Sequence, residues 1–279
     1  MVVTNTRSAR RVRSRTRPQL KMFSRHRVLD PTRPDRVAPG LCALGIMTKV
    51  PRAGRVKTRL QPPLSADEAA ALNICFLRDT AAAINLAGSR GGNSVGIGVY
   101  TPVGEEAAYA AILPEGFTLI PQRCEDFGER LVAACDDLFA CGFAAVCLIN
   151  SDSPTVLASS FHRAAELLRQ PGERVVLGPS DDGGYYVIGL QRTRRELFQR
   201  IDWSTERVFK QTLDRAKEIS LSVELLPTCF DIDDGATLRR LCDELLSDGT
   251  DPTVAPATRE FLSQLIAREG RDRVWPERD

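Results

Sequence analysis

Apolar and polar residues follow two alternating patterns from residue 41 onward. Short apolar runs bounded by Gly, Pro or polar residues predict strands at 41–48, 95–100, 117–121, 144–150, 174–178, 185–190 and 221–226. Longer segments with helical spacing predict helices at 65–87, 126–142, 156–170, 194–200, 204–218, 236–247 and 256–268. This alternation predicts an α/β fold of three layers, in which a mostly parallel sheet has helices on both faces.

The first 38 residues lack this periodicity. They carry ten Arg and one Lys against two Asp, and their prolines oppose regular structure. We expect a disordered basic tail at 1–38 and a single domain at 39–279. Several interpretations of this segment remain open. It could be a solvated tail, or an over-extended start with Met22 as the later candidate. It could also be a leader that resembles an organellar transit peptide or, with less support, an arm that contacts nucleic acid.

The remaining composition narrows the classes of function. No stretch approaches 18 uncharged apolar residues, so we expect no membrane span. Eight cysteines without a C-x-x-C pair are typical of buried thiols in a reducing cytoplasm, where we expect the protein. His26 lies in the predicted tail and His162 within a predicted helix, on its surface. A histidine base and the Ser or Cys triads that need one are therefore not expected.

Polar clusters follow four of the predicted strands. The first runs from Lys49 to Leu60 and places five cations near Gly54, which suits a polyphosphate. It lacks the glycine of a Walker loop at Val56, and a solvated basic loop is the alternative.

The second cluster places Asp152 at the end of a buried apolar strand. An unpaired carboxylate there is costly, so we expect a partner such as Mg²⁺ or Mn²⁺. A helix N-cap formed by Asp152 or Ser153 is the alternative, with Pro154 at the helix start.

The last two clusters are weaker on their own. Asp181, Asp182, Gly183, Gly184 and Tyr185 could admit a ligand or form a turn.

Asp231 and Asp233 share a face of an extended segment, so either could complete a metal site with Asp152, or the segment could cap the helix near 236. Trp203 either begins the cap of the helix at 204–218 or borders an acceptor pocket. Because ligands of such sheets bind beyond the carboxyl ends of the strands, all four clusters could meet in one crevice.

Residues 41–240 resemble the bacterial GT-A-like family known as rSAM/selenodomain-associated transferases. The matching stretches are Lys49-Val-Pro, Gly54-Arg-Val-Lys-Thr-Arg-Leu60, Ser151-Asp-Ser-Pro154, Leu177-Gly-Pro, Asp181-Asp-Gly-Gly-Tyr-Tyr186, Trp203-Ser-Thr205 and Phe230-Asp-Ile-Asp233. The loop and the Asp-x-Pro turn are more distantly similar to 2-phospho-lactate guanylyltransferase and molybdenum-cofactor guanylyltransferase. Tyr185-Tyr186 stand where the phospho-lactate enzymes have Thr-Asn.

The resemblance implies a nucleotide-diphospho-sugar transferase fold and a set of site residues. The implied nucleotide-binding residues are Lys49, Gly54, Arg55, Lys57 and Arg59, of which Lys57 and Arg59 act in catalysis with Asp152. The implied metal ligands are Asp152, Asp231 and Asp233. The implied acceptor-binding residues are Asp181, Asp182, Gly183, Gly184, Tyr185 and Trp203.

Three functions remain open from the sequence. The first is Mg-dependent nucleotidyl transfer from a nucleoside triphosphate to a small phosphorylated or anionic acceptor, which needs no strong base. The second is glycosyl transfer from a nucleotide sugar, for which Asp181, Asp182 or Asp234 could be the base. The third is nucleotide binding without catalysis. The partners expected are a nucleotide and a small-molecule substrate, and the sequence does not exclude a homodimer.

Overall fold

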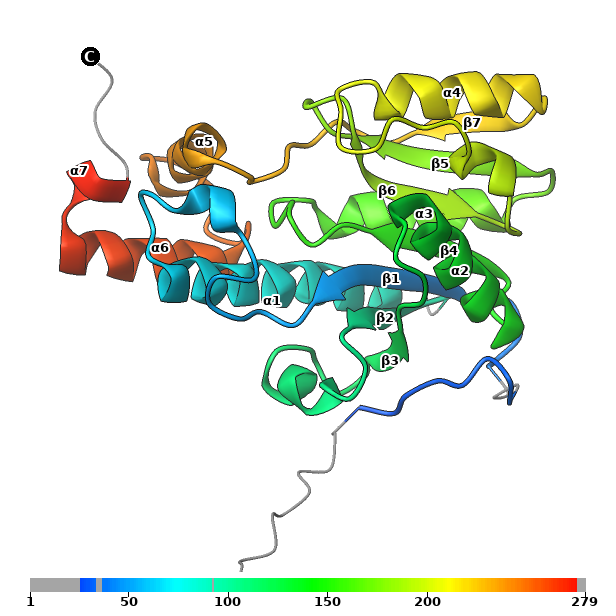
Figure 1. Cartoon of the computed structure of the whole chain (residues 1–279), viewed down its shortest axis with the longest axis horizontal. Helices are drawn as coiled ribbons and strands as arrows, with labels where there is room; N and C mark the ends of the chain where they lie inside the picture. Colours follow the sequence, from blue (N-terminus) through cyan, green and yellow to red (C-terminus); the bar gives the residue numbers. More distant parts are fainter. Residues whose placement is uncertain (1–25, 34–36, 92, 275–279) are drawn as a thin grey trace, which may run out of the picture.

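A seven-stranded sheet forms the centre of the molecule (Figure 1). The computed structural model describes residues 26–33, 37–91 and 93–274. The strands are β1 (Cys42–Lys49), β2 (Ser94–Thr101), β3 (Thr118–Pro121), β4 (Ala145–Ile149), β5 (Arg174–Pro179), β6 (Tyr185–Leu190) and β7 (Ser222–Leu225). Their order is β3-β2-β1-β4-β6-β5-β7, and β6 runs antiparallel to both of its neighbours while the other pairs are parallel. The predicted mostly parallel sheet is confirmed.

Helices cover both faces of this sheet. The α-helices are α1 (Ala66–Gly91), α2 (Phe127–Ala140), α3 (Ala158–Arg169), α4 (Val208–Glu218), α5 (Gly235–Leu246), α6 (Pro256–Glu269) and α7 (Arg271–Val274). The 3₁₀ turns are η1 (Thr58–Leu60), η2 (Glu106–Ala111) and η3 (Arg195–Phe198). Because side chains alternate along a strand, Leu44 and Ile46 of β1 pack with α1 and α3, and Ala43 packs with α2 and α4. The three layers predicted from the sequence are thus present.

The predicted helix starts are confirmed at two places. Ser65 N donates to Glu68 Oε2 at 2.8 Å, and Glu68 N donates to Ser65 Oγ at 3.3 Å, which is a capping box at the start of α1. Asp126 caps α2 by accepting from Glu129 N at 3.0 Å. The helix predicted at 194–200 is only the single turn η3, and α3 begins at Ala158, so Pro154 is not its first residue.

A third apolar cluster lies beyond the carboxyl ends of the strands. There α5, α6 and α7 pack beside the first half of α1, as the left side of Figure 1 shows. Leu72 and Phe76 of α1 are fully buried against Leu241 and Leu265 in this cluster. Phe230 and Ile232 belong to it too, which brings the segment before α5 up to the loop after β1.

The predicted tail is wrong for residues 26–33. Leu29 N donates to Leu119 O at 2.7 Å, so this segment pairs with the outer edge of β3. The ring nitrogens of His26 lie 3.1 and 3.2 Å from the carbonyl oxygens of Phe117 and Tyr109, and the side chain is buried. The exposed edge of β3 offers unpaired backbone N–H and C=O groups. Hydrogen bonds to these groups order the segment although its composition is polar. Residues 1–25 and 34–36 lie outside the described part of the chain.

Two further expectations concern the whole described chain. All eight cysteines lie within it and are free thiols, with Cys124 exposed, Cys229 half-buried and the others buried. Among the described residues, no helix combines the length and the apolar character that crossing a membrane requires.

Candidate functional site

Two adjoining cavities open at the carboxyl edge of the sheet, where β1, β4 and β5 end. The first, about 250 Å³ in volume, is called the lysine cavity; it is lined by Lys49, Val56, Lys57, Thr58, Arg59, Asn73, Ser151, Asp152 and Asp233. The second, about 650 Å³, is called the aromatic cavity; it is lined by Arg59, Phe127, Asn150, Asp152, Asp182, Gly184, Tyr185, Trp203, Ser204, Thr205, Glu206, Val208, Asp231 and Asp233. Residues from all four predicted clusters therefore meet, and Arg59, Asp152 and Asp233 belong to both cavities.

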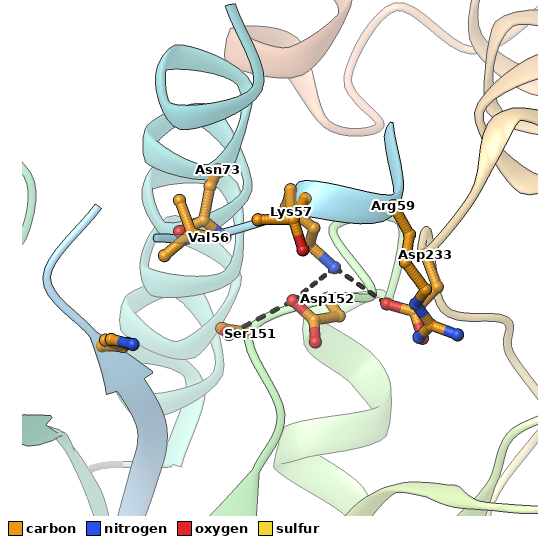
Figure 2. A pocket seen from close by; sticks show the side chains of 9 residues that line it. Val56, Lys57, Arg59, Asn73, Ser151, Asp152 and Asp233 are labelled. Atoms are coloured by element: carbon orange, nitrogen blue, oxygen red, sulfur yellow. Dashed lines mark hydrogen bonds and ion pairs between the residues drawn. The ribbon is translucent and has the colours of Figure 1, made fainter. Parts of the chain in front are cut away.

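Lys57 lies in the lysine cavity between Asp152 and Asp233 (Figure 2). Its Nζ lies 2.6 Å from Asp152 Oδ1 and 3.2 Å from Asp233 Oδ1, and it donates to the carbonyl of Ile232 at 2.7 Å. Only 5% of its side chain is exposed. The backbone of Lys57 is left-handed, with φ 48° and ψ 40°, which costs a non-glycine residue about 1–2 kcal/mol. A strained backbone that buries a charge is typical of a functional position.

Asp233 holds two cations of the first cluster in place. Besides its contact with Lys57, its Oδ2 lies 2.6 Å from the Arg59 guanidinium. Thr237 Oγ1 accepts from Asp233 N at 2.9 Å, which fixes the backbone just before α5. Asp234 forms a capping box with Thr237, so the alternative of a helix cap is realised by Asp234.

Asp231 lines the aromatic cavity together with Asp152. Asn150 Nδ2 donates to Asp231 Oδ1 at 2.8 Å, and Ser153 Oγ donates to the same oxygen. Burial raises the pKa of Asp231 to about 6; the bonds from Ser153 and Asn150 oppose the rise, while the charges of Asp152 and Asp182 add to it. Asp231 is thus a half-buried carboxylate in a group of like charges.

The three predicted metal ligands are not arranged around one point. In the described part of the chain, no three His, Cys, Asp or Glu side chains are grouped as ligands of one ion. The Lys57 ammonium lies between Asp152 and Asp233 and compensates the charge of both carboxylates. Asp152 and Asp231 both line the aromatic cavity and offer the oxygen donors that Mg²⁺ or Mn²⁺ prefers. A cation there would compensate a carboxylate whose pKa is raised mainly by burial and further by the charges of Asp152 and Asp182, so these two residues fit such an ion.

The predicted acceptor residues divide into two groups. Asp182, Gly184, Tyr185 and Trp203 line the aromatic cavity. Asp181 instead pairs with Arg240 of α5.

Gly183 is also not open to a ligand. A Cβ at this position would lie 2.1 Å from the carbonyl oxygen of Glu206, so the chain's own backbone makes the close approach that the sequence assigned to a ligand.

The predicted nucleotide-binding residues also divide. Lys49, Lys57 and Arg59 line the lysine cavity, whereas Gly54 and Arg55 are exposed in the turn before it. Gly54 has φ +69°, which explains a glycine in this turn without a ligand.

Phe127 and Asn73 are among the lining residues that were not predicted from the sequence. Phe127 lies edge-on to Trp203, with ring centroids 5.0 Å apart, and 45% of it is exposed. Its large apolar side chain directly after the helix cap Asp126 is a signal that could have been noticed. Asn73 is a polar residue at a buried position of α1, a second such signal.

Comparisons with known proteins give a partial family match. A family model described as an uncharacterised protein conserved in bacteria, DUF2064, matches residues 94–205, less than half of the chain. No curated protein matches the chain.

Solved structures give a broader match. A protein of Desulfovibrio desulfuricans G20, to which nucleotide-diphospho-sugar transferase activity is attributed, is 26% identical; the match covers 83% of this chain and 98% of that one, with a TM-score of 0.71. Rv0371c from Mycobacterium tuberculosis H37Rv is 16% identical over 74% of this chain and 100% of that one, with a TM-score of 0.45. A CMP:2-keto-3-deoxy-manno-octonic acid synthetase with bound CTP is 11% identical over 80% and 99%, with a TM-score of 0.48. The match to the Desulfovibrio protein shows that the chain has the nucleotide-diphospho-sugar transferase fold that the resemblance implies.

Proposed function

We propose that this chain is a transferase that acts on a nucleotide-linked donor and holds the donor's phosphates in the lysine cavity. The observation that carries this proposal is the buried ammonium of Lys57 between Asp152 and Asp233, with Lys49 and Arg59 in the same lining. Ammonium and guanidinium groups in a concave site bind phosphate oxygens through charge-assisted hydrogen bonds. The similarity to the Desulfovibrio protein supports the same class of reaction.

Asp152 and Asp231 would hold a divalent cation beside these phosphates. Such an ion would neutralise the charge that develops on the leaving diphosphate. Lys57 and Arg59 stabilise that charge from the other side, and their geometry is set in advance by Asp233. Asp233 accordingly acts as a positioning residue in this proposal rather than as a third metal ligand.

The charge of the aromatic cavity bears on the choice between the two transfer reactions. Its lining contains the acids Asp152, Asp182, Glu206, Asp231 and Asp233 and the cation Arg59. With a cation on Asp152 and Asp231, and Asp233 paired with Lys57 and Arg59, the negative charges of Asp182 and Glu206 remain uncompensated within the lining. A phosphorylated acceptor, as expected for nucleotidyl transfer, would meet repulsion there. A neutral hydroxyl acceptor would not, and the aromatic pair of Phe127 and Trp203 offers an apolar surface for a ring. We therefore favour glycosyl transfer. Nucleotidyl transfer is the second candidate, because the cations of the lysine cavity also suit a triphosphate.

In glycosyl transfer the acceptor oxygen forms a bond to the anomeric carbon as the bond from that carbon to the diphosphate breaks. The acceptor proton passes to a carboxylate of the cavity, and Asp182 is the residue proposed for this role. Its Oδ1 accepts from Gly184 N at 2.9 Å, which orients the carboxylate at the cavity wall. The nucleoside diphosphate leaves with its charge balanced by Lys57 and Arg59.

The test is a panel of nucleotide sugars and nucleoside triphosphates, each with Mg²⁺ or Mn²⁺. Thermal shifts rank the ligands, since a ligand at 100 times its Kd stabilises by about 2.7 kcal/mol. Product analysis then separates the reactions. Release of a nucleoside diphosphate from a sugar donor supports glycosyl transfer, and release of pyrophosphate from a triphosphate supports nucleotidyl transfer. A protein that binds none of these ligands contradicts both.

A further inference from the structure

Asn73 is a buried amide that faces the lysine cavity. It lies on α1 and is 4% exposed, and its side chain belongs to the cavity lining (Figure 2). Among the residues that the structure describes, no side chain or backbone group forms a hydrogen bond with this amide. An amide in such a position has two N–H donors and one carbonyl acceptor without a protein partner.

The neighbours of Asn73 on the same face of α1 are apolar. Ala69, Phe76 and Leu77 lie three or four residues away on the same helix, and all three are fully buried. The Asn73 amide has no partner within the described protein, so at this buried position a molecule in the lysine cavity is what can pair with it. The fold itself therefore gives no reason for Asn73, and the cavity in front of it does.

We infer that Asn73 hydrogen-bonds the nucleoside part of the donor, through a hydroxyl of the ribose or the polar edge of the base. This inference rests on the proposed function. A hydroxyl or a base edge both donates and accepts, so it can satisfy the carbonyl and the N–H groups of the amide. A phosphate oxygen only accepts and would leave the carbonyl oxygen of Asn73 unpaired.

The arrangement of the cavity supports the same assignment. Figure 2 shows Asn73 beside Val56 on the α1 side, while the Lys57 ammonium points to Asp152 and Asp233. The charged end of the cavity suits phosphates. The end formed by an amide and an apolar side chain suits an uncharged ring with a polar edge.

The variant Asn73→Leu tests the inference, because it removes the amide and keeps a side chain of similar size. Its control is Thr80→Val on the same helix, since the Thr80 hydroxyl is also buried without a hydrogen-bond partner but lies outside the lysine cavity. Calorimetry with Mg²⁺ measures binding of the four common nucleoside diphosphates and of inorganic pyrophosphate. Asn73→Leu is expected to weaken the best-bound diphosphate at least tenfold and pyrophosphate less than twofold. Thr80→Val is expected to change neither.

The melting temperature without ligand gives a second readout. It is expected to stay the same or to rise in Asn73→Leu, because no hydrogen bond of the folded protein is lost; Asn73→Ala replaces this variant if the leucine does not fit. An unchanged diphosphate affinity overturns the inference, and so does an equal loss for pyrophosphate. A 2′-deoxy diphosphate that is weakened less by the variant identifies the ribose as the partner, and equal weakening identifies the base. If the wild-type protein binds neither pyrophosphate nor any diphosphate, the proposed function fails; if it binds pyrophosphate alone, only this inference fails.

Discussion

Replacing Gly183 by alanine is expected to destabilise the protein and to disturb the aromatic cavity. Gly183 has φ +89°, a conformation that costs an L-residue about 1–2 kcal/mol. In addition, a Cβ would lie 2.1 Å from Glu206 O and 2.6 Å from Glu206 C, although real Cβ contacts stay beyond 3.0 Å. The backbone of Glu206 must therefore move by about 0.9 Å, the difference between 3.0 and 2.1 Å. Overpacking of this kind costs typically another 1–3 kcal/mol, so the total is about 2–5 kcal/mol.

The control is Gly249→Ala, which separates the two contributions. Gly249 has a similar φ of +78°, and a Cβ there would meet nothing within 4 Å. With about 2–4 °C per kcal/mol for a chain of this size, Gly183→Ala is expected to lower the melting temperature by roughly 4–20 °C, and Gly249→Ala by only about 2–8 °C. Differential scanning calorimetry measures both.

The functional readout uses the neighbours of Glu206. Ser204 and Trp203 line the aromatic cavity on the same segment, so their displacement is expected to raise the KM for the acceptor more than that for the donor. Equal melting temperatures for the two variants would refute the steric part of the reasoning. An unchanged acceptor KM would show that the loop and the segment around Trp203 do not form one wall.

Three other changes test the fold. Asp79 is a buried carboxylate that accepts hydrogen bonds from two backbone N–H groups at the start of α6, at 2.9 and 2.8 Å. Asp79→Ala is expected to lower the free energy of unfolding, measured by chemical denaturation, by about 1–3 kcal/mol, and Asp79→Asn by less. Hydrogen bonds from Arg192 and then Arg194 lower the pKa of Glu173 to about 2. The stabilisation by the Glu173 carboxylate is therefore complete above about pH 4.5 and is lost as the pH falls toward 2. Glu173→Gln should reduce the loss of unfolding free energy between these pH values, and an unchanged loss would refute the pairing. His26→Ala is expected to speed hydrogen exchange of the amides that join its segment to β3, and unchanged exchange would mean that the ring does not hold the segment.

Local chemistry explains why so much of the fold could be predicted. The capping residues Ser65 and Asp126 act within one helical turn, so their sequence neighbours contain the whole interaction. The alternation of Ala43 and Leu44 between two faces likewise follows from strand geometry alone. The meeting of the four clusters was predictable for a similar reason, since parallel strands end at one edge of the sheet.

The details within the site could not be predicted, because they depend on which side chains meet across the fold. Asp181 and Asp182 are adjacent, yet one pairs with Arg240 and the other lines a cavity. Asp233 was expected to bind metal, but Lys57 and Arg59 reach it across more than 170 positions of sequence. Asn73 stands out as a polar residue at a buried position of α1, but its place in the wall of the lysine cavity follows only from the fold.

The central claim is that Lys57 binds the donor's diphosphate, and calorimetry on matched variants of one loop tests it most directly. Lys57→Met removes the buried ammonium, while Arg55→Met removes an exposed cation two residues away. A lost charge-assisted hydrogen bond of about 1.5–3 kcal/mol corresponds to roughly 10- to 150-fold weaker binding. We predict this loss for inorganic pyrophosphate with Mg²⁺ in Lys57→Met, and less than a threefold change in Arg55→Met. Equal affinities in the two variants, both folded by circular dichroism, would contradict the account.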